Sequence, residues 1–432
     1  MARAARLPRV KRRERVPTQP RPIEHRVLIT ATLCLIAIGA VMVYSASSAR
    51  NLLEGSGDGT AYLVRYVGLG LIALAGMHIM SRHGYELTKR FMPLLLIGSF
   101  FACVIVLVPG IGTEVNGARS WLGPGIFSPQ PSEFMKLALI LYCAQFLAAH
   151  PRRIETFRGM MSPVGIVAGG ACLLIIIQPD TGTTLLIAGI VAAILIAAGV
   201  PLRFLGYLAG IGLLLLIVLI LFQPYQQDRL TSFLDPWASK TGEGFQASQG
   251  FIALGSGGLF GVGLGQSVQK VFYLPEAHTD FILAVIGEEL GLFGVTVVIA
   301  LFGLIVWSGL RIARSATDQY AKLVAVGLTA LISCQAILNI FVVLGMAPLT
   351  GVPLPFISYG PTNLIVILGA VGLLLNLADR NRAYMRLVDP STGRRRTTAR
   401  SQRDPGAEDR DRRRRDGGPR RAGSGGRRRA AG

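Results

Sequence analysis

The apolar residues of this chain occur in long blocks rather than at the spacing of an amphipathic helix or strand. About 20 apolar residues are needed to cross the core of a bilayer as a helix, and ten blocks approach that length with few charges. We therefore predict an all-α polytopic integral membrane protein with about ten transmembrane helices. The helices are expected at residues 27–46, 62–80, 91–109, 131–149, 161–178, 182–199, 201–222, 281–310, 322–346 and 360–378. Arginine-rich sequence precedes the first block, as in a signal peptide, but its length and the spans that follow favour an uncleaved anchor.

The composition predicts a membrane body between two basic tails. Hydrophobic residues make up 51% of the chain and charged residues 16%, whereas soluble domains carry about 25% charged residues. The net charge of +20 gathers at the two ends of the chain. We predict a basic N-terminal tail at 1–26, a membrane domain at 27–380 and an Arg-rich, disordered C-terminal tail at 381–432. Basic residues beside membrane spans are more typical of the cytoplasmic face and anionic lipid than of nucleic acid binding.

The loops predict the orientation of the chain. Alternate loops carry the positive residues Arg82, Lys89, Arg90, Arg152, Arg153, Arg158, Arg203, Arg311, Arg314 and Lys322, on the same side as the two basic tails. The positive-inside rule therefore predicts that both termini are cytoplasmic. The opposite, extracytoplasmic side then receives residues 110–130 and a long loop at 223–280, between the seventh and eighth helices.

Two features that could suggest cofactor binding are better explained otherwise. The glycines between Gly255 and Gly265 imitate a nucleotide-binding loop, but no strand precedes them and the loop is expected to face outward. A re-entrant or interfacial turn is favoured. All five cysteines fall inside apolar runs without metal-like spacing, which favours a packing role.

The strongest candidate for chemistry is the segment from Tyr273 to Gly291, which places Glu276, His278, Asp280, Glu288 and Glu289 at the start of an apolar run. Charges at the mouth of a membrane span are costly unless they serve a function. Asp280 stands where the long loop re-enters the membrane, and partial desolvation there suits a general base. A helix N-terminal residue stabilised by the macrodipole explains the same position equally well.

Further candidates are predicted on the same outer side. Glu133 and Lys136 are spaced i, i+3 on one helical face, so they form an ion pair, or one of them meets an anionic substrate. The Arg119 guanidinium could bind phosphate or could lie at the interface. Residues 178–182 are expected to form a tight turn, and residues 353–360 either line a groove or break the helix. A lipid-linked, anionic, external substrate fits this collection.

Four motifs of the chain closely resemble those of the SEDS family (shape, elongation, division and sporulation), in order over residues 25–380. They read Val115-Asn-Gly-Ala-Arg119-Ser-Trp121, Gln130-Pro-Ser-Glu133-Phe-Met-Lys136, Gln178-Pro-Asp-Thr-Gly182 and Tyr273-Leu-Pro-Glu-Ala-His-Thr-Asp280. Ser267-Val-Gln-Lys270 and Ala277 make the chain most like the cell-division members, since elongation members typically carry Gln where Ala277 stands.

The resemblance implies a peptidoglycan glycosyltransferase of ten spans at the outer face of the bacterial cytoplasmic membrane, acting at the division septum. Its substrate would be lipid II, and its partners a class B penicillin-binding protein, other divisome proteins and membrane lipids, with no nucleic acid. The family's essential carboxylate maps onto Asp280, which would take the proton from the acceptor hydroxyl. The substrate-binding residues implied by the motifs are Glu133, Lys136, Arg119, Gln130, Ser132, His278, Thr279, Ser358 and Tyr359. A divalent cation (Mg or Mn) aids the family, although the sequence offers no closed metal site.

The chain departs from the family at Ser120, where a second Arg is usual, and at Pro361, where glycine is usual. Pro361 removes a backbone donor and restricts the chain, which bears on the shape of the groove and on the choice between division and elongation. The alternatives are an elongation polymerase, a transporter that flips lipid II, and a scaffold that activates a synthase. A transporter is expected to carry its charges near mid-membrane, whereas here they gather at one face.

Overall fold

The computed structural model describes residues 22–53, 59–115, 117–123, 128–238, 242–271, 274 and 277–388. Within these ranges, nine helices are long and apolar enough to cross a membrane. They are α1 (Ile23–Leu53), α2 (Ala61–Val106), α3 (Pro131–Ala149), α4 with α5 (Phe157–Met160 and Ile166–Ile177, joined by a π-helical turn), α6 (Thr181–Ala198), α7 (Leu202–Phe222), α10 (Ile282–Arg314), α11 (Gln319–Val343) and α12 (Pro361–Val388). The all-α polytopic fold predicted from the sequence is confirmed.

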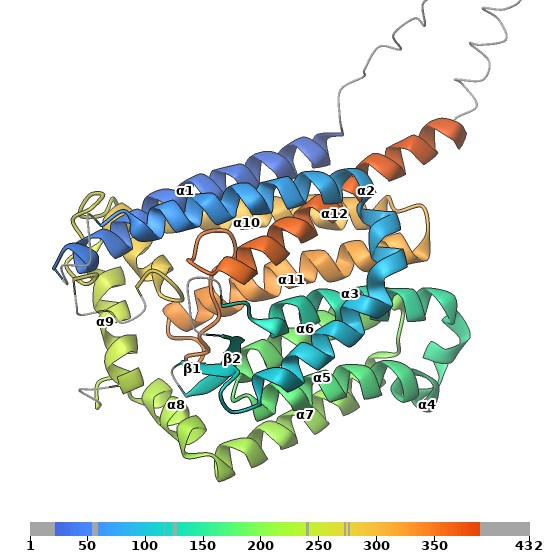
Figure 1. The fold of residues 1–432 in the computed structure, drawn as a ribbon, viewed down its shortest axis with the longest axis horizontal. Coiled ribbons are helices and arrows are strands. Elements are labelled where there is room, and N and C mark those ends of the chain that lie inside the picture. Colours follow the sequence, from blue (N-terminus) through green and yellow to red (C-terminus); the bar gives the residue numbers. More distant parts are fainter. Residues whose placement is uncertain are drawn as a thin grey trace, which may run out of the picture. The chain divides into compact units, whose positions relative to one another are not determined.

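Helix α2 accounts for the difference between nine helices and ten predicted spans. Its 46 residues would extend about 69 Å if straight, against about 30 Å for a bilayer core. Figure 1 shows α2 running beside α1, bending, and returning toward strand β1. The spans predicted at 62–80 and 91–109 are therefore the two arms of this helix, and the loop expected between them is helical instead.

One end of the membrane domain, at the left of Figure 1, carries the irregular segments and is called the loop-rich end below. It holds the antiparallel hairpin of β1 (Gly112–Val115) and β2 (Ala118–Leu122), the turn before α6, helices α8 (Pro224–Leu234) and α9 (Gly242–Ser256), and the starts of α10 and α12. The sequence predicted 223–280 as a loop, and α8 and α9 were missed. The beginning of α1 lies at the opposite end.

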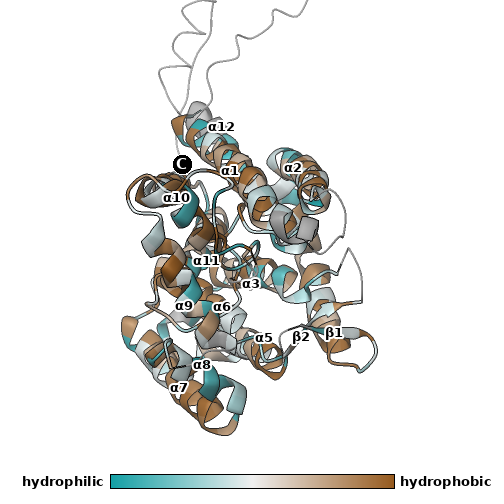
Figure 2. Cartoon of the chain, turned by 90° about the vertical axis from the view of Figure 1, so that its left-hand side faces the viewer, coloured by the Kyte–Doolittle hydropathy of each residue, from teal (hydrophilic) through white to brown (hydrophobic). Residues whose placement is uncertain are grey.

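Burial divides the helices into central and peripheral ones. Leu323, Leu331 and Leu374 in α11 and α12 are fully buried, whereas Leu213 and Leu221 of α7 are exposed. Figure 2 shows hydrophobic residues on peripheral helices such as α5 and α7. Apolar side chains on the outward faces suit contact with lipid. The helical backbone also suits it, because a helix satisfies its backbone hydrogen bonds within itself.

The glycine-rich segment packs its backbone against a kink in α10. At the kink, Gly291 has φ 67°, and the neighbouring amides of Leu292 and Phe293 donate to the carbonyl oxygens of residues 258 and 259 at 3.0 and 3.1 Å. A Cβ on Gly261 would lie 2.1 Å from the Glu289 carbonyl oxygen. These glycines therefore permit a close approach of two backbones, which explains the pattern that imitates a nucleotide loop.

Candidate active site

Asp280 lies in the turn before α10, at the loop-rich end. The N-cap position of α10 is Phe281, so Asp280 is not the capping residue. The Thr279 hydroxyl donates to Oδ1 of Asp280 at 3.0 Å, and Nδ2 of Asn339 donates to the Asp280 backbone oxygen at 2.8 Å. A Cβ on Gly351 would lie 3.9 Å from Oδ2 of Asp280, so the segment after α11 borders the carboxylate.

Glu133 and Lys136 form the predicted i, i+3 ion pair in the first turns of α3. Nζ of Lys136 lies 2.8 Å from Oε1 of Glu133, and the side chains are 1% and 3% exposed. Nζ also donates to Oε1 of Gln335 at 3.3 Å, and Nδ2 of Asn363 donates to Oε2 of Glu133 at 3.2 Å. The pair is closed off by protein, so the geometry gives it a structural role. Contact of either residue with a substrate stays a prediction.

Helix α11 links the ion pair to the Asp280 turn. Gln335 and Asn339 are 0% and 1% exposed and stand one turn apart. Nε2 of Gln335 donates to the Pro353 oxygen at 3.0 Å, and Nδ2 of Asn339 donates to the Val352 oxygen at 2.9 Å. Buried amides are costly unless bonded, and these two are bonded to consecutive carbonyl groups of one segment.

Gln130 and Asp180 extend this network. Nε2 of Gln130 donates to Oδ2 of Asp180 at 3.3 Å, and the Thr183 amide donates to Oδ1 at 2.9 Å, which makes Asp180 the N-cap of α6. Burial raises the pKa of the Asp180 carboxyl, and the hydrogen bonds from Thr183 and then the charge of Lys136 oppose that shift. The sequence predicted only a tight turn here, so the link from Asp180 to the site was missed.

His278 and Tyr359 meet in an aromatic cluster with Tyr62. The Tyr62 ring centroid lies 4.8 Å from that of His278 and 5.0 Å from that of Tyr359. The Tyr359 amide donates to the His278 oxygen at 3.0 Å, and the Arg65 guanidinium lies 5.9 Å from the Tyr62 centroid. Burial raises the pKa of Tyr359, and Arg65 opposes that shift. Tyr62 and Arg65 were not predicted.

The elbow at residues 353–360 is packed into the core. Phe356 is 1% exposed and adopts φ 67°, a strained conformation for a non-glycine residue. The Ser358 hydroxyl accepts from the Leu354 amide at 2.8 Å, and the Tyr66 hydroxyl donates to the Phe356 oxygen. The predicted site residue Ser358 is therefore used to close this turn.

The remaining predicted residues lie in different settings. Arg119 is on β2, where Nη2 lies 3.3 Å from Oε2 of Glu114 and the side chain is 36% exposed. Ser132 is buried in the first turn of α3, and its hydroxyl has no hydrogen-bond partner within the described part of the chain. Glu276 lies outside the described residues.

Glu288 and Glu289 order the loop that leads to Asp280. The Ser267 hydroxyl and the Val268 amide donate to Glu288, the latter at 3.0 Å. Nζ of Lys270 lies 2.7 Å from Oε1 of Glu289, with both side chains buried. These contacts give the two glutamates a loop-ordering role.

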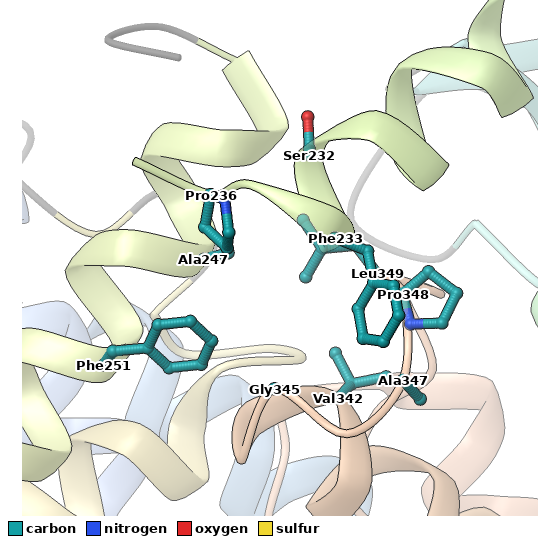
Figure 3. Close-up of a pocket in the computed structure, with 10 residues that line it drawn as sticks. All are labelled: Ser232, Phe233, Pro236, Ala247, Phe251, Val342, Gly345, Ala347, Pro348 and Leu349. Atoms are coloured by element: carbon teal, nitrogen blue, oxygen red, sulfur yellow. The ribbon is translucent and has the colours of Figure 1, made fainter. Parts of the chain in front are cut away.

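A shallow apolar groove lies elsewhere at the loop-rich end, between α8, α9 and the end of α11 (Figure 3). It is lined by Ser232, Phe233, Pro236, Ala247, Phe251, Val342, Gly345, Ala347, Pro348 and Leu349. None of these side chains titrates, so the groove cannot supply acid–base chemistry. Asp280 is accordingly the better centre for a reaction.

The expected divalent cation finds no closed protein site among the residues that the structure describes. Within those ranges, no group of three or more His, Cys, Asp or Glu side chains could hold a metal ion. Mg²⁺ is usually held by one or two carboxylates together with substrate phosphates rather than by a closed protein site, so a divalent cation that binds with the substrate stays a prediction.

The polar residues that the sequence missed share a recognisable signal. Gln335, Asn339 and Asn363 all stand inside predicted spans, where polar side chains are costly and commonly functional. The same criterion that identified Asp280 applies to them. What the sequence cannot give is their partners, which come from elements far apart in the chain.

Comparison with known proteins identifies the family of this chain. Residues 25–383 match the model of the cell cycle protein family that includes FtsW, RodA and SpoVE. Stage V sporulation protein E of Bacillus subtilis (strain 168) is 44% identical over 359 residues, which cover 82% of this chain and 97% of that protein. A probable peptidoglycan glycosyltransferase FtsW of Geobacter sp. (strain M18) is 39% identical, with coverage of 82% and 97%.

Solved structures show the same fold. One chain from a structure of a peptidoglycan synthase complex that coordinates polymerization and crosslinking superposes with a TM-score of 0.66 and 27% identity, covering 82% of this chain and 97% of that one. The rod shape determining protein RodA of Thermus thermophilus superposes with a TM-score of 0.59 and 27% identity, covering 82% and 96%. The chain therefore belongs to the cell cycle protein family of FtsW, RodA and SpoVE.

Proposed function

We propose that this chain is a peptidoglycan glycosyltransferase that polymerises lipid II into glycan strands. The observation that carries the proposal is the setting of Asp280, a carboxylate on a non-helical turn at the loop-rich end, bordered by Gly351 and held from α11 by Asn339. A polar site at one end of an apolar bundle suits a substrate whose lipid chain stays in the membrane while its sugars react at the surface.

In the proposed reaction, Asp280 acts as the general base. Its carboxylate takes the proton from the acceptor sugar hydroxyl, and the freed oxygen attacks the anomeric carbon of the donor. The bond from that carbon to the pyrophosphate oxygen breaks, and undecaprenyl pyrophosphate leaves with the electron pair. One glycosidic bond forms for each bond between an anomeric carbon and pyrophosphate that breaks. The proton remains on Asp280 until solvent removes it.

The charge that develops on the leaving pyrophosphate requires nearby cations or donors. Arg119 can supply this charge, because its side chain is 36% exposed and its present partner, Glu114, is itself exposed. Lys136 is already bonded to Glu133 and Gln335 in a buried position. We therefore assign Arg119 to the pyrophosphate, and we assign the Glu133–Lys136 pair to the support of the site.

The membrane setting and the partner are part of the same proposal. The loop-rich end would face outward and both termini would be cytoplasmic, which the basic residues near the opposite end support. A class B penicillin-binding protein is the proposed partner, since one similar fold occurs in a peptidoglycan synthase complex. A role in division at the septum is supported by similarity to FtsW proteins, and elongation or sporulation is the alternative.

The test is a polymerisation assay with the purified chain and its partner synthase, given lipid II in detergent. The wild-type complex should yield glycan strands, and Asp280→Ala should abolish them while the complex stays intact. Asp228→Ala, which removes an exposed carboxylate from α8, is the matched control and should retain activity. Normal polymerisation by Asp280→Ala would refute the general-base role. If the wild-type chain does not polymerise lipid II, but reconstituted Asp280→Ala still moves lipid II across the bilayer, transport would be favoured instead.

A further inference from the structure

Two carboxamide side chains on α11 contact the site but take no part in the proposed proton transfer. Gln335 and Asn339 lie four residues apart, so they share one helical face, and both are buried. Both amides bond to the segment after α11, and each also bonds to a second part of the site. Helix α11 itself is among the more buried spans of the described chain, so it is a rigid base from which to hold other segments.

The geometry fixes the orientation of the Asn339 amide. Nδ2 donates to the backbone oxygens of Asp280 at 2.8 Å and Val352 at 2.9 Å. Carbonyl oxygens only accept, so the amide nitrogen, with its two hydrogens, must face them. Oδ1 then has no partner within the described part of the chain. Both donors of Asn339 are therefore committed to holding two segments that lie 72 residues apart in sequence numbering, at 280 and 352.

One of these bonds acts on the residue that carries the proposed base. Asp280 precedes the N-cap of α10 and lies in a turn, where the backbone is less constrained than within a helix. A bond to its carbonyl oxygen restrains the peptide plane next to its Cα, and so the direction in which its side chain starts. The second bond, to Val352, holds the segment whose Gly351 borders the Asp280 carboxylate.

Gln335 connects α11 to the Glu133–Lys136 ion pair, as Asn339 connects it to Asp280. Nε2 donates to the Pro353 oxygen, and Oε1 accepts from Lys136. The carbonyl groups of Val352 and Pro353 are consecutive, so the two amides grip one short stretch of backbone from the same helical face. Helix α11 therefore holds both Asp280 and Lys136 in place relative to the same segment.

We propose that Asn339 is the positioning residue for Asp280, acting through the backbone of the base and of its neighbouring segment without touching substrate. This inference rests on the proposed function. A general base must be held close to the productive geometry, and displacement by about 1 Å can cost about 100-fold in rate. Loss of an interaction that acts only on the reacting geometry lowers kcat and leaves KM unchanged.

The test measures lipid II polymerisation by the full chain in complex with its partner synthase. The rate is expressed per mole of complex, as kcat, together with the KM for lipid II. Asn339→Leu keeps the volume and removes both donors, and it should lower kcat by about 10- to 100-fold with KM within about twofold. Thr329→Val is the matched control, because the buried Thr329 hydroxyl donates to the Ala325 oxygen of its own helix and has no other hydrogen bond among the residues that the structure describes. This variant should change kcat by less than about twofold. Asn339→Ala, which removes both donors without adding bulk, should lower kcat in the same way and serves if the leucine variant does not fold.

A second comparison separates positioning from general support of the fold. In a chain that already carries Asp280→Glu, the longer side chain no longer depends on the same backbone placement, so Asn339→Leu should cost less than about threefold further. Equal factors in both backgrounds, or a raised KM with unchanged kcat, would overturn the inference. Wild-type kcat in Asn339→Leu would overturn it while leaving the proposed function intact, whereas wild-type kcat in Asp280→Ala would refute the general-base role on which the inference rests, and absence of glycan synthesis by the wild-type complex would refute the proposed function itself.

Discussion

Breaking the Glu133–Lys136 pair from one side should destabilise the protein more than removing both charges. Lys136→Met keeps the length of the side chain and leaves the Glu133 carboxylate buried, with the Asn363 amide as a remaining donor. At the observed 2.8 Å, the attraction is about 6 kcal/mol for an effective dielectric constant of about 20. Desolvation offsets much of that attraction in the intact protein, but the loss of one partner costs about 3–5 kcal/mol.

The double variant Glu133→Gln with Lys136→Met contains no buried charge at this place. It should therefore be more stable than either single variant, with a coupling free energy of about 3 kcal/mol or more. The measurement is reversible unfolding of the purified chain in mixed micelles with added SDS, followed by circular dichroism. The quantity compared is the free energy of unfolding of the four chains of the cycle.

The exposed pair of Arg119 and Glu114 provides the matched control. Its atoms are 3.3 Å apart, but its side chains are 36% and 56% exposed. A cycle with Arg119→Met and Glu114→Gln should give a coupling of only about 0–1 kcal/mol. If the Glu133–Lys136 cycle gave a value as small as this control, the pair would not be buried as the structure has it.

Two further predictions concern the turn before α6 and the glycine segment. Because burial raises the pKa of Asp180, its contribution to stability is fully present below the unfolded pKa of about 3.9 and is lost as pH rises through the folded pKa. Asn also caps helices, so the melting temperature of Asp180→Asn should gain on that of wild type as pH rises from about 4 to 7, and parallel curves would contradict the shift. Gly261→Ala should cost more than about 2 kcal/mol, since its Cβ would meet the Glu289 oxygen. Gly265→Ala, with similar φ and open space, should cost only about 1–2 kcal/mol, and equal losses would argue against the close approach.

The positions of the membrane helices follow directly from the sequence, because length and hydropathy decide which segments can enter a bilayer. The span expected at 131–149 begins and ends as α3 does. The bend within α2 was predicted as a loop, since Arg82, Lys89 and Arg90 interrupt the apolar run there. Charged residues at a membrane surface are compatible with helix, so hydropathy could not show that the backbone stays helical.

The candidate site was only partly predictable for a different reason. The i, i+3 spacing of Glu133 and Lys136 fixes a local contact, and the structure contains it. Asn339 meets Asp280 across 59 residues of sequence, and such a contact depends on how helices pack rather than on any local pattern. Likewise, α8 and α9 were missed because their mixed polar and apolar residues lack the continuous apolar run that identified the spans.

The central claim is that Asp280 removes the proton in lipid II polymerisation. The most direct measurement is the rate of glycan synthesis at saturating lipid II by Asp280→Asn in complex with its partner synthase, compared with wild type and Asp228→Asn. The amide keeps the shape of the carboxylate and cannot accept the proton, so the rate should fall by about 100- to 10,000-fold with unchanged lipid II binding, while Asp228→Asn stays near wild type. A rate for Asp280→Asn within about tenfold of wild type would contradict the assignment of the general base.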